Sequence, residues 1–97
     1  MSRRRSRLEI ILSILSVVRE GKDKTTNIMY AVNLSWDPTK KILSDLVEQG
    51  LLELRIASGL SKRRYVITEK GVNVIDYFEK AKEILPKEIY LDHAIYS

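Results

Sequence analysis

Residues 35–65 constrain the fold of this chain more than any other stretch, because signals for a helix, a helix stop and a basic hairpin follow one another there. A helix is expected from about 35 to 49, with Ser35 or Asp37 as its cap and Pro38 in its first turn. Its apolar residues recur at helical spacing: Ile42, Leu43, Leu46 and Val47. Gly50 is expected to end this helix.

Residues 52–67 show the alternation that is typical of two half-buried strands. Apolar residues occupy every second position on each side of a loop: Leu52, Leu54 and Ile56, then Tyr65 and Ile67. The loop and its edge carry Ser58, Gly59, Ser61, Lys62 and Arg63. A hairpin with this much positive charge, directly after a short helix, is typical of the wing of a winged helix-turn-helix domain.

The remaining segments fit the same domain. Ser6 and Glu9 have the spacing of a capping box at the start of a first helix, which is expected to end before Gly21. Thr25 or Thr26 is expected to cap a short second helix through Ala31, and a turn then leads into the helix at 35–49. The predicted fold class is mainly α with a small β-hairpin, a winged helix-turn-helix with a long C-terminal helix.

The far half of that C-terminal helix is expected to project from the domain and to need a partner. Thr68 caps it, Pro86 ends or kinks it, and its length of about 27 Å exceeds what is needed to cover the wing. We expect residues 1–67 to form a head with a basic N-terminal arm, and residues 68–97 to form the dimerisation helix and a short tail. The predicted dimerisation residues are Val74, Ile75, Phe78, Ala81, Lys82 and Leu85.

Composition narrows the possible functions. The chain has no cysteine, which excludes a disulfide framework and a thiolate metal site. The single histidine, His93, has no recognisable nucleophile or second ligand beside it, so we expect no enzyme and no cofactor. No apolar run is long enough to span a membrane, and a cytoplasmic, nucleoid-associated protein is expected. The net charge of +4 is concentrated in residues 1–67, which favours a polyanionic partner.

The sequence also resembles a known family. The resemblance covers about residues 5–85 and rests on the runs Ile28–Ser35, Gly50–Leu52 and Tyr65–Gly71. It is a family of small archaeal winged-helix proteins known as chromatin-associated DNA binders and as transcriptional regulators. The resemblance implies a homodimer with two DNA-binding heads, joined by an antiparallel coiled coil of the C-terminal helices.

The candidate DNA-binding residues fall into four groups. The arm contributes Arg3, Arg4, Arg5 and Arg7, which either follow the DNA backbone or form a solubilising end. The wing contributes Lys62, Arg63 and Arg64. The helix at 35–49 contributes Ser35, Trp36, Thr39 and Lys40 toward the major groove and Lys41 toward phosphate. Thr25 and Thr26 are expected to bind phosphate or simply to cap their helix.

The sequence therefore predicts a homodimeric double-stranded DNA-binding protein, either a transcriptional regulator or a chromatin-organising protein. The alternative is a winged-helix module for protein–protein interaction, which would use an apolar surface around Trp36, Tyr30 and Leu60. For Trp36 two roles stay open, contact with DNA or structural packing of its ring on Tyr30 or Leu34. No pattern in the sequence identifies a small-molecule effector or an operator.

Overall fold

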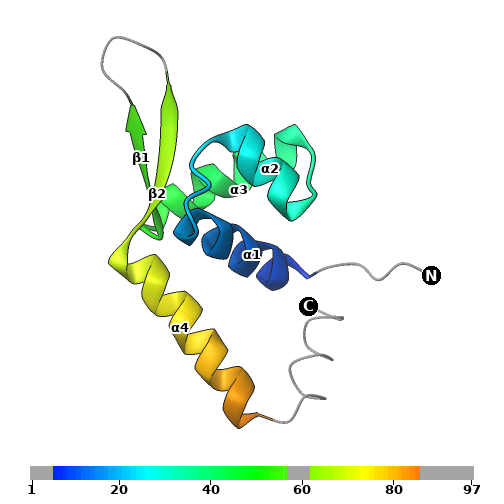
Figure 1. Ribbon diagram of the computed structural model, residues 1–97, viewed down its shortest axis with the longest axis vertical. Helices are drawn as coiled ribbons and strands as arrows, with labels where there is room; N and C mark the ends of the chain where they lie inside the picture. Colours follow the sequence, from blue (N-terminus) through cyan, green and yellow to red (C-terminus); the bar gives the residue numbers. More distant parts are fainter. Residues whose placement is uncertain (1–5, 57–61, 86–97) are drawn as a thin grey trace, which may run out of the picture.

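The computed structural model describes residues 6–56 and 62–85, which form four helices and a two-stranded hairpin (Figure 1). The helices are α1 (Arg7–Arg19), α2 (Thr25–Val32), α3 (Trp36–Glu48) and α4 (Glu69–Ile84), and the strands are β1 (Leu52–Ile56) and β2 (Arg63–Ile67). The hairpin and α4 extend in different directions from the bundle of α1, α2 and α3 (Figure 1). The predicted fold class, a winged helix-turn-helix, is confirmed.

Helix α1 begins with the predicted capping box. The Ser6 hydroxyl accepts a hydrogen bond from the amide of Glu9 at 3.1 Å, and the Ser6 amide donates to the Glu9 carboxylate at 3.0 Å. These two bonds satisfy backbone donors that have no partner inside the helix. Among the residues that α1 buries are Ile14, Leu15 and Val18, which form the centre of the core.

Helices α2 and α3 meet at a tight turn. Asn33 adopts the left-handed conformation with φ of 59°, and the amide of Leu34 donates to the Met29 carbonyl at 3.0 Å. The cap of α2 is Lys24, so the expectation that Thr25 or Thr26 caps this helix is wrong: the helix starts earlier, and both threonines lie within its first turn. Of the two predicted caps of α3, Ser35 and Asp37, the structure has Ser35 at the cap position, although its side chain makes no capping hydrogen bond.

Strands β1 and β2 pair antiparallel, with Leu54 opposite Tyr65 and Arg55 opposite Arg64. The other edge of β2 is held by the linker between α1 and α2, because the amide of Tyr65 donates to the Asp23 carbonyl at 2.8 Å. Side chains alternate across a strand, so Leu52 and Tyr65 face the core while Arg55 and Arg64 lie on the outer face of the hairpin.

Helix α4 starts where the hairpin returns to the core. The Thr68 hydroxyl accepts from the amide of Gly71 at 3.1 Å, as the sequence predicts. Gly71 is buried against the Leu51 carbonyl, where a Cβ atom would have no room. The helix ends at Ile84, with Leu85 as its cap.

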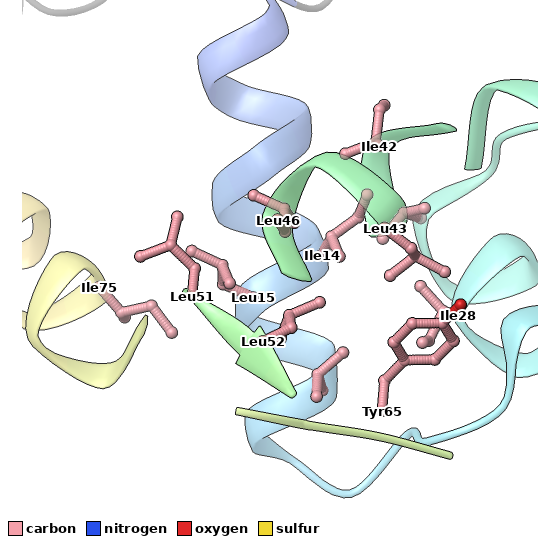
Figure 2. Packing of buried hydrophobic residues seen from close by; sticks show 12 residues of the cluster. Ile14, Leu15, Ile28, Ile42, Leu43, Leu46, Leu51, Leu52, Tyr65 and Ile75 are labelled. Atoms are coloured by element: carbon pink, nitrogen blue, oxygen red, sulfur yellow. The ribbon is translucent and has the colours of Figure 1, made fainter. Parts of the chain in front are cut away.

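The core lies between α1, α2, α3, the hairpin and the first turns of α4. Figure 2 shows Tyr65 of β2 pointing toward Ile28 of α2, and Ile75 of α4 pointing toward Leu51. Ile75 is only 4% exposed, so the expectation that it joins two subunits is wrong. It packs within its own chain because α4 contacts α1 and β2 here. In the part of the chain that the structure describes, no helix is long and apolar enough to cross a membrane.

Candidate nucleic-acid interface

The first turns of α3 present a polar and aromatic surface. Ser35, Trp36, Lys40 and Lys41 are all exposed. The Lys40 ammonium lies 5.6 Å from the centre of the Trp36 ring, within the range of a cation–π contact. This contact orients Lys40 and reduces the rotational freedom of both side chains. The start of α3 thus combines an exposed indole, 45% accessible, with two cations.

Thr39 does not belong to this surface. Its side chain is fully buried, and its hydroxyl donates to the Ser35 carbonyl at 2.8 Å. The sequence prediction assigned Thr39 to the DNA-binding surface because it lies near the start of the helix, without considering which face of the helix it occupies. Thr39 continues the buried stripe of Ile42, Leu43 and Leu46 at helical spacing.

The wing places its three predicted cations in different environments. Lys62, just before β2, and Arg63, the first residue of β2, are both exposed. Arg64 is half-buried, and its Nη1 donates to the Asp23 carboxylate at 2.9 Å. Together with the Tyr65 amide bond, this ion pair anchors β2 to the linker between α1 and α2, so Arg64 has a structural partner that the sequence alone does not reveal.

The predicted DNA-binding residues of the arm and of the start of α2 differ in how far they are exposed. Arg3, Arg4 and Arg5 lie outside the described residues. Arg7 is exposed and forms an ion pair of 3.2 Å with Asp45, which joins α1 to α3. Thr26 is exposed and Thr25 is half-buried. Leu60, part of the apolar surface expected for a protein-interaction module, also lies outside the described residues.

Helix α4 has an exposed apolar face beyond its buried first turns. Tyr77 and Ile84 are 71% and 73% exposed. A shallow groove runs between Tyr77, Lys80, Ala81, Ile84 and Leu85. The Phe78 ring meets the Tyr77 ring edge to face, with 5.6 Å between the ring centres. Lys82, one of the predicted dimerisation residues, is exposed in the last turn.

The sequence prediction missed Tyr77 and Ile84. The signal that would have found them is a spacing of four and three residues through Tyr77, Ala81 and Ile84, which is the spacing of a coiled-coil seam. Val74, one turn earlier and also a predicted dimerisation residue, packs partly against the core of its own chain. The seam spacing was hidden by the stripe through Ile75, which is shifted by one residue and faces the chain's own core.

Two further ion pairs link described residues on both sides. Arg19 and Asp76 tie α1 to α4 at 3.1 Å, and Arg55 pairs with Glu53 on β1 at 2.7 Å. Residues 6–56 and 62–85 contain no group of histidine, cysteine or acidic side chains that could hold a metal ion.

Residues 4–85 match the winged helix-turn-helix family, and the chain belongs to that family, which is typically non-enzymatic. The uncharacterized protein MJ0287 of Methanocaldococcus jannaschii is 30% identical over 82 residues, covering 84% of this chain and 78% of that protein. The structure of Sso10a-2, a DNA-binding protein from Sulfolobus solfataricus, is similar with a TM-score of 0.73 and 27% identity. That match covers 92% of this chain and 90% of the other.

Two bacterial proteins share the fold at lower identity. A mutant of ZitR from Lactococcus lactis matches 77% of this chain with a TM-score of 0.66 and 24% identity. A MarR family transcriptional regulator from Silicibacter pomeroyi matches 75% with a TM-score of 0.65 and 20% identity. This chain spans 58% of the ZitR chain and 50% of the MarR family chain, and at these identities the likenesses show the fold alone.

Proposed function

We propose that this protein is a homodimer that binds double-stranded DNA, with α3 in the major groove and the wing on the DNA backbone. The observation that carries the proposal is the exposed start of α3, where Lys40 and Lys41 lie beside Trp36 in a winged helix-turn-helix fold. The likeness to Sso10a-2, a DNA-binding protein of which this chain covers 90%, supports DNA as the partner.

The roles of the α3 residues follow from their chemistry. The indole of Trp36 offers an apolar edge to thymine methyl groups, and Ser35 can contact either a base or a phosphate. Lys40 and Lys41 are exposed point charges suited to phosphate or to guanine. Arg, Asn and Gln, which recognise bases with two hydrogen bonds, are absent from the first turns of α3. We therefore propose that sequence discrimination is weak.

Lys62 and Arg63 are the proposed backbone contacts of the wing, and Arg3, Arg4, Arg5 and Arg7 those of the arm. Within the described residues, neither Lys62 nor Arg63 forms an ion pair, so their charges are available to phosphate. Arg7 would have to exchange Asp45 for phosphate. Thr26, exposed in the first turn of α2, is a further candidate for a phosphate contact.

The proposed dimer forms through the exposed apolar face of α4. Tyr77, Ala81 and Ile84 line its groove, and a second α4 packed there would cover them. The coiled-coil spacing supports the interface that the family resemblance implies. Phe78 and Leu85 remain in the proposed interface beside this seam, and Ile75 leaves it because it is buried in its own head. Lys82 would lie at the edge.

The biological role is either transcription control or chromatin organisation in a cytoplasmic nucleoid. A regulator with two heads should prefer inverted sites at a fixed spacing, whereas an architectural protein should bind most sequences alike. The scarcity of base-reading side chains in α3 favours the architectural role.

Charge reversal on α3 tests the proposal. The double variant K40E/K41E should lose at least tenfold in affinity for a fluorescently labelled duplex of random sequence, because two phosphate-binding cations become acidic. K22E, which reverses an exposed lysine in the linker between α1 and α2, is the control and should bind far better than the double variant. Equal affinities of K40E/K41E and the unmodified protein would remove α3 from the mechanism.

One observation favours a second function, a protein–protein interaction module. Tyr30 is 78% exposed and, with Trp36, flanks the turn between α2 and α3. Exposed aromatic side chains are frequent in protein interfaces. This alternative predicts that the unmodified protein binds no DNA even at low salt, and that replacing Tyr30 and Trp36 by Ala abolishes capture of a protein partner.

A further inference from the structure

We infer that Arg55 and Arg64 form a phosphate-binding site on the outer face of the wing, and that Glu53 occupies this site in the absence of DNA. This inference rests on the proposed function and extends it to a residue, Arg55, that no sequence pattern singled out. The ligand it assigns is a single phosphodiester group of the DNA backbone.

The first step is the placement of the two arginines. Arg55 lies directly opposite Arg64 in the strand register. The amide of the next residue, Tyr65, points away from β1 to the Asp23 carbonyl, so the two arginines occupy a hydrogen-bonded pair of the ladder. Cα atoms in such a pair are about 5.5 Å apart, and the side chains lie on the same face.

The second step is the charge at this position. Two like charges directly opposite each other destabilise a hairpin unless counter-charges neutralise them. Each arginine here has its own carboxylate: Glu53 at 2.7 Å from the Arg55 Nε, and Asp23 at 2.9 Å from the Arg64 Nη1. The outer face of the wing is therefore already organised to hold negative oxygen atoms against two guanidinium groups.

The third step is the difference between these two carboxylates. Asp23 is fixed, because its backbone carbonyl also accepts the Tyr65 amide and its side chain is half-buried. Glu53 and Arg55 are 55% and 65% exposed, and an exposed pair of this kind contributes little stability. Glu53 is thus the carboxylate that a phosphate can replace, while Asp23 keeps Arg64 in place.

The geometry suits a phosphodiester group. A guanidinium has five N–H donors, and the bond to Asp23 engages one of those on Arg64. Phosphate oxygens accept paired hydrogen bonds from arginine. A phosphate between Arg55 and Arg64 would remove their mutual repulsion, and its arrival would free the Glu53 carboxylate to solvent.

A double-mutant cycle tests the inference by fluorescence anisotropy on a labelled random-sequence duplex. Arg55→Ala should lower affinity roughly tenfold, the loss expected for one charged hydrogen-bonded contact, and reduce the salt slope by about one per head. Glu53→Gln should raise affinity roughly two- to fivefold, because no carboxylate then competes with phosphate. In the Arg55→Ala background, Glu53→Gln should change affinity by much less.

Glu79→Gln is the control, since it removes an equal charge from an exposed site on α4 and not on the wing. It should raise affinity less than Glu53→Gln does. Weaker binding by Glu53→Gln, or the same gain with and without Arg55, would overturn the inference. If K40E/K41E loses DNA binding while Arg55→Ala does not, the phosphate site is wrong and the proposed function stands. If the unmodified protein binds no DNA, both fail.

Discussion

Replacing Gly71 by Ala should destabilise the protein, although alanine is the better helix former. Gly71 lies in the first turn of α4, where the added methyl group would meet the Leu51 carbonyl oxygen and, at 2.7 Å, the Cγ1 atom of Ile67. That carbonyl cannot move freely. It accepts the Thr68 amide at 3.2 Å and lies 3.0 Å from the Thr68 hydroxyl oxygen.

The magnitudes decide the sign of this prediction. Replacing glycine by alanine inside a helix gains about 1 kcal/mol at a site with room for the methyl group. Inserting a methyl group into a closely packed site costs about 1 to 3 kcal/mol, and here the obstacle is a hydrogen-bonded backbone atom. We expect a net loss of about 1 kcal/mol in the free energy of unfolding. In a domain of this size, that loss lowers the Tm by roughly 4 to 8 °C.

Thermal unfolding followed by circular dichroism measures this effect, at one protein concentration because subunit association would change the Tm. Asn73→Ala is the matched control: it is exposed in the same helix and gains helix propensity without a clash, so its Tm should stay the same or rise. A Gly71→Ala variant as stable as Asn73→Ala would refute the argument that the root of α4 is packed against the Leu51 carbonyl.

Two further predictions concern the dimer and the wing. Ile84→Asp should give a folded monomer in light scattering, because the dimer would bury an unpaired carboxylate between the two α4 helices. The control Glu83→Asp, on another face of α4, should remain dimeric. A dimeric Ile84→Asp variant would rule out this interface. Arg64→Glu should reduce the free energy of unfolding in urea by about 1 kcal/mol more than Arg63→Glu, because it places a carboxylate beside Asp23, and equal losses would show that the pair is not structural.

The local elements were largely predictable because short-range patterns determine them. The capping box at Ser6 and Glu9, the stop at Gly50 and the cap at Thr68 each involve residues close in sequence. The start of α2 was placed late because threonine is a good capping residue, whereas here the backbone of Lys24 already takes the cap position without a side-chain bond.

The candidate site was less predictable, because it depends on contacts between distant segments. Nothing in the sequence around Arg64 indicates that Asp23, 41 residues earlier, is its partner. The burial of Ile75 likewise depends on how α4 packs against α1 and β2. Thr39 is different, because helical spacing alone places it on the same face as the buried residues of α3. Its polar hydroxyl made an exposed position seem more natural than a buried one.

The salt dependence of DNA binding tests the central claim most directly. Anisotropy of a labelled random-sequence duplex, titrated with the full chain at several salt concentrations, gives the slope of log affinity against log salt. If two heads together neutralise about eight phosphates, this slope should be near −7. Tight binding with a slope of that order is the result we predict, and absence of binding at low salt would contradict the DNA-binding function and favour a protein partner at Tyr30 and Trp36.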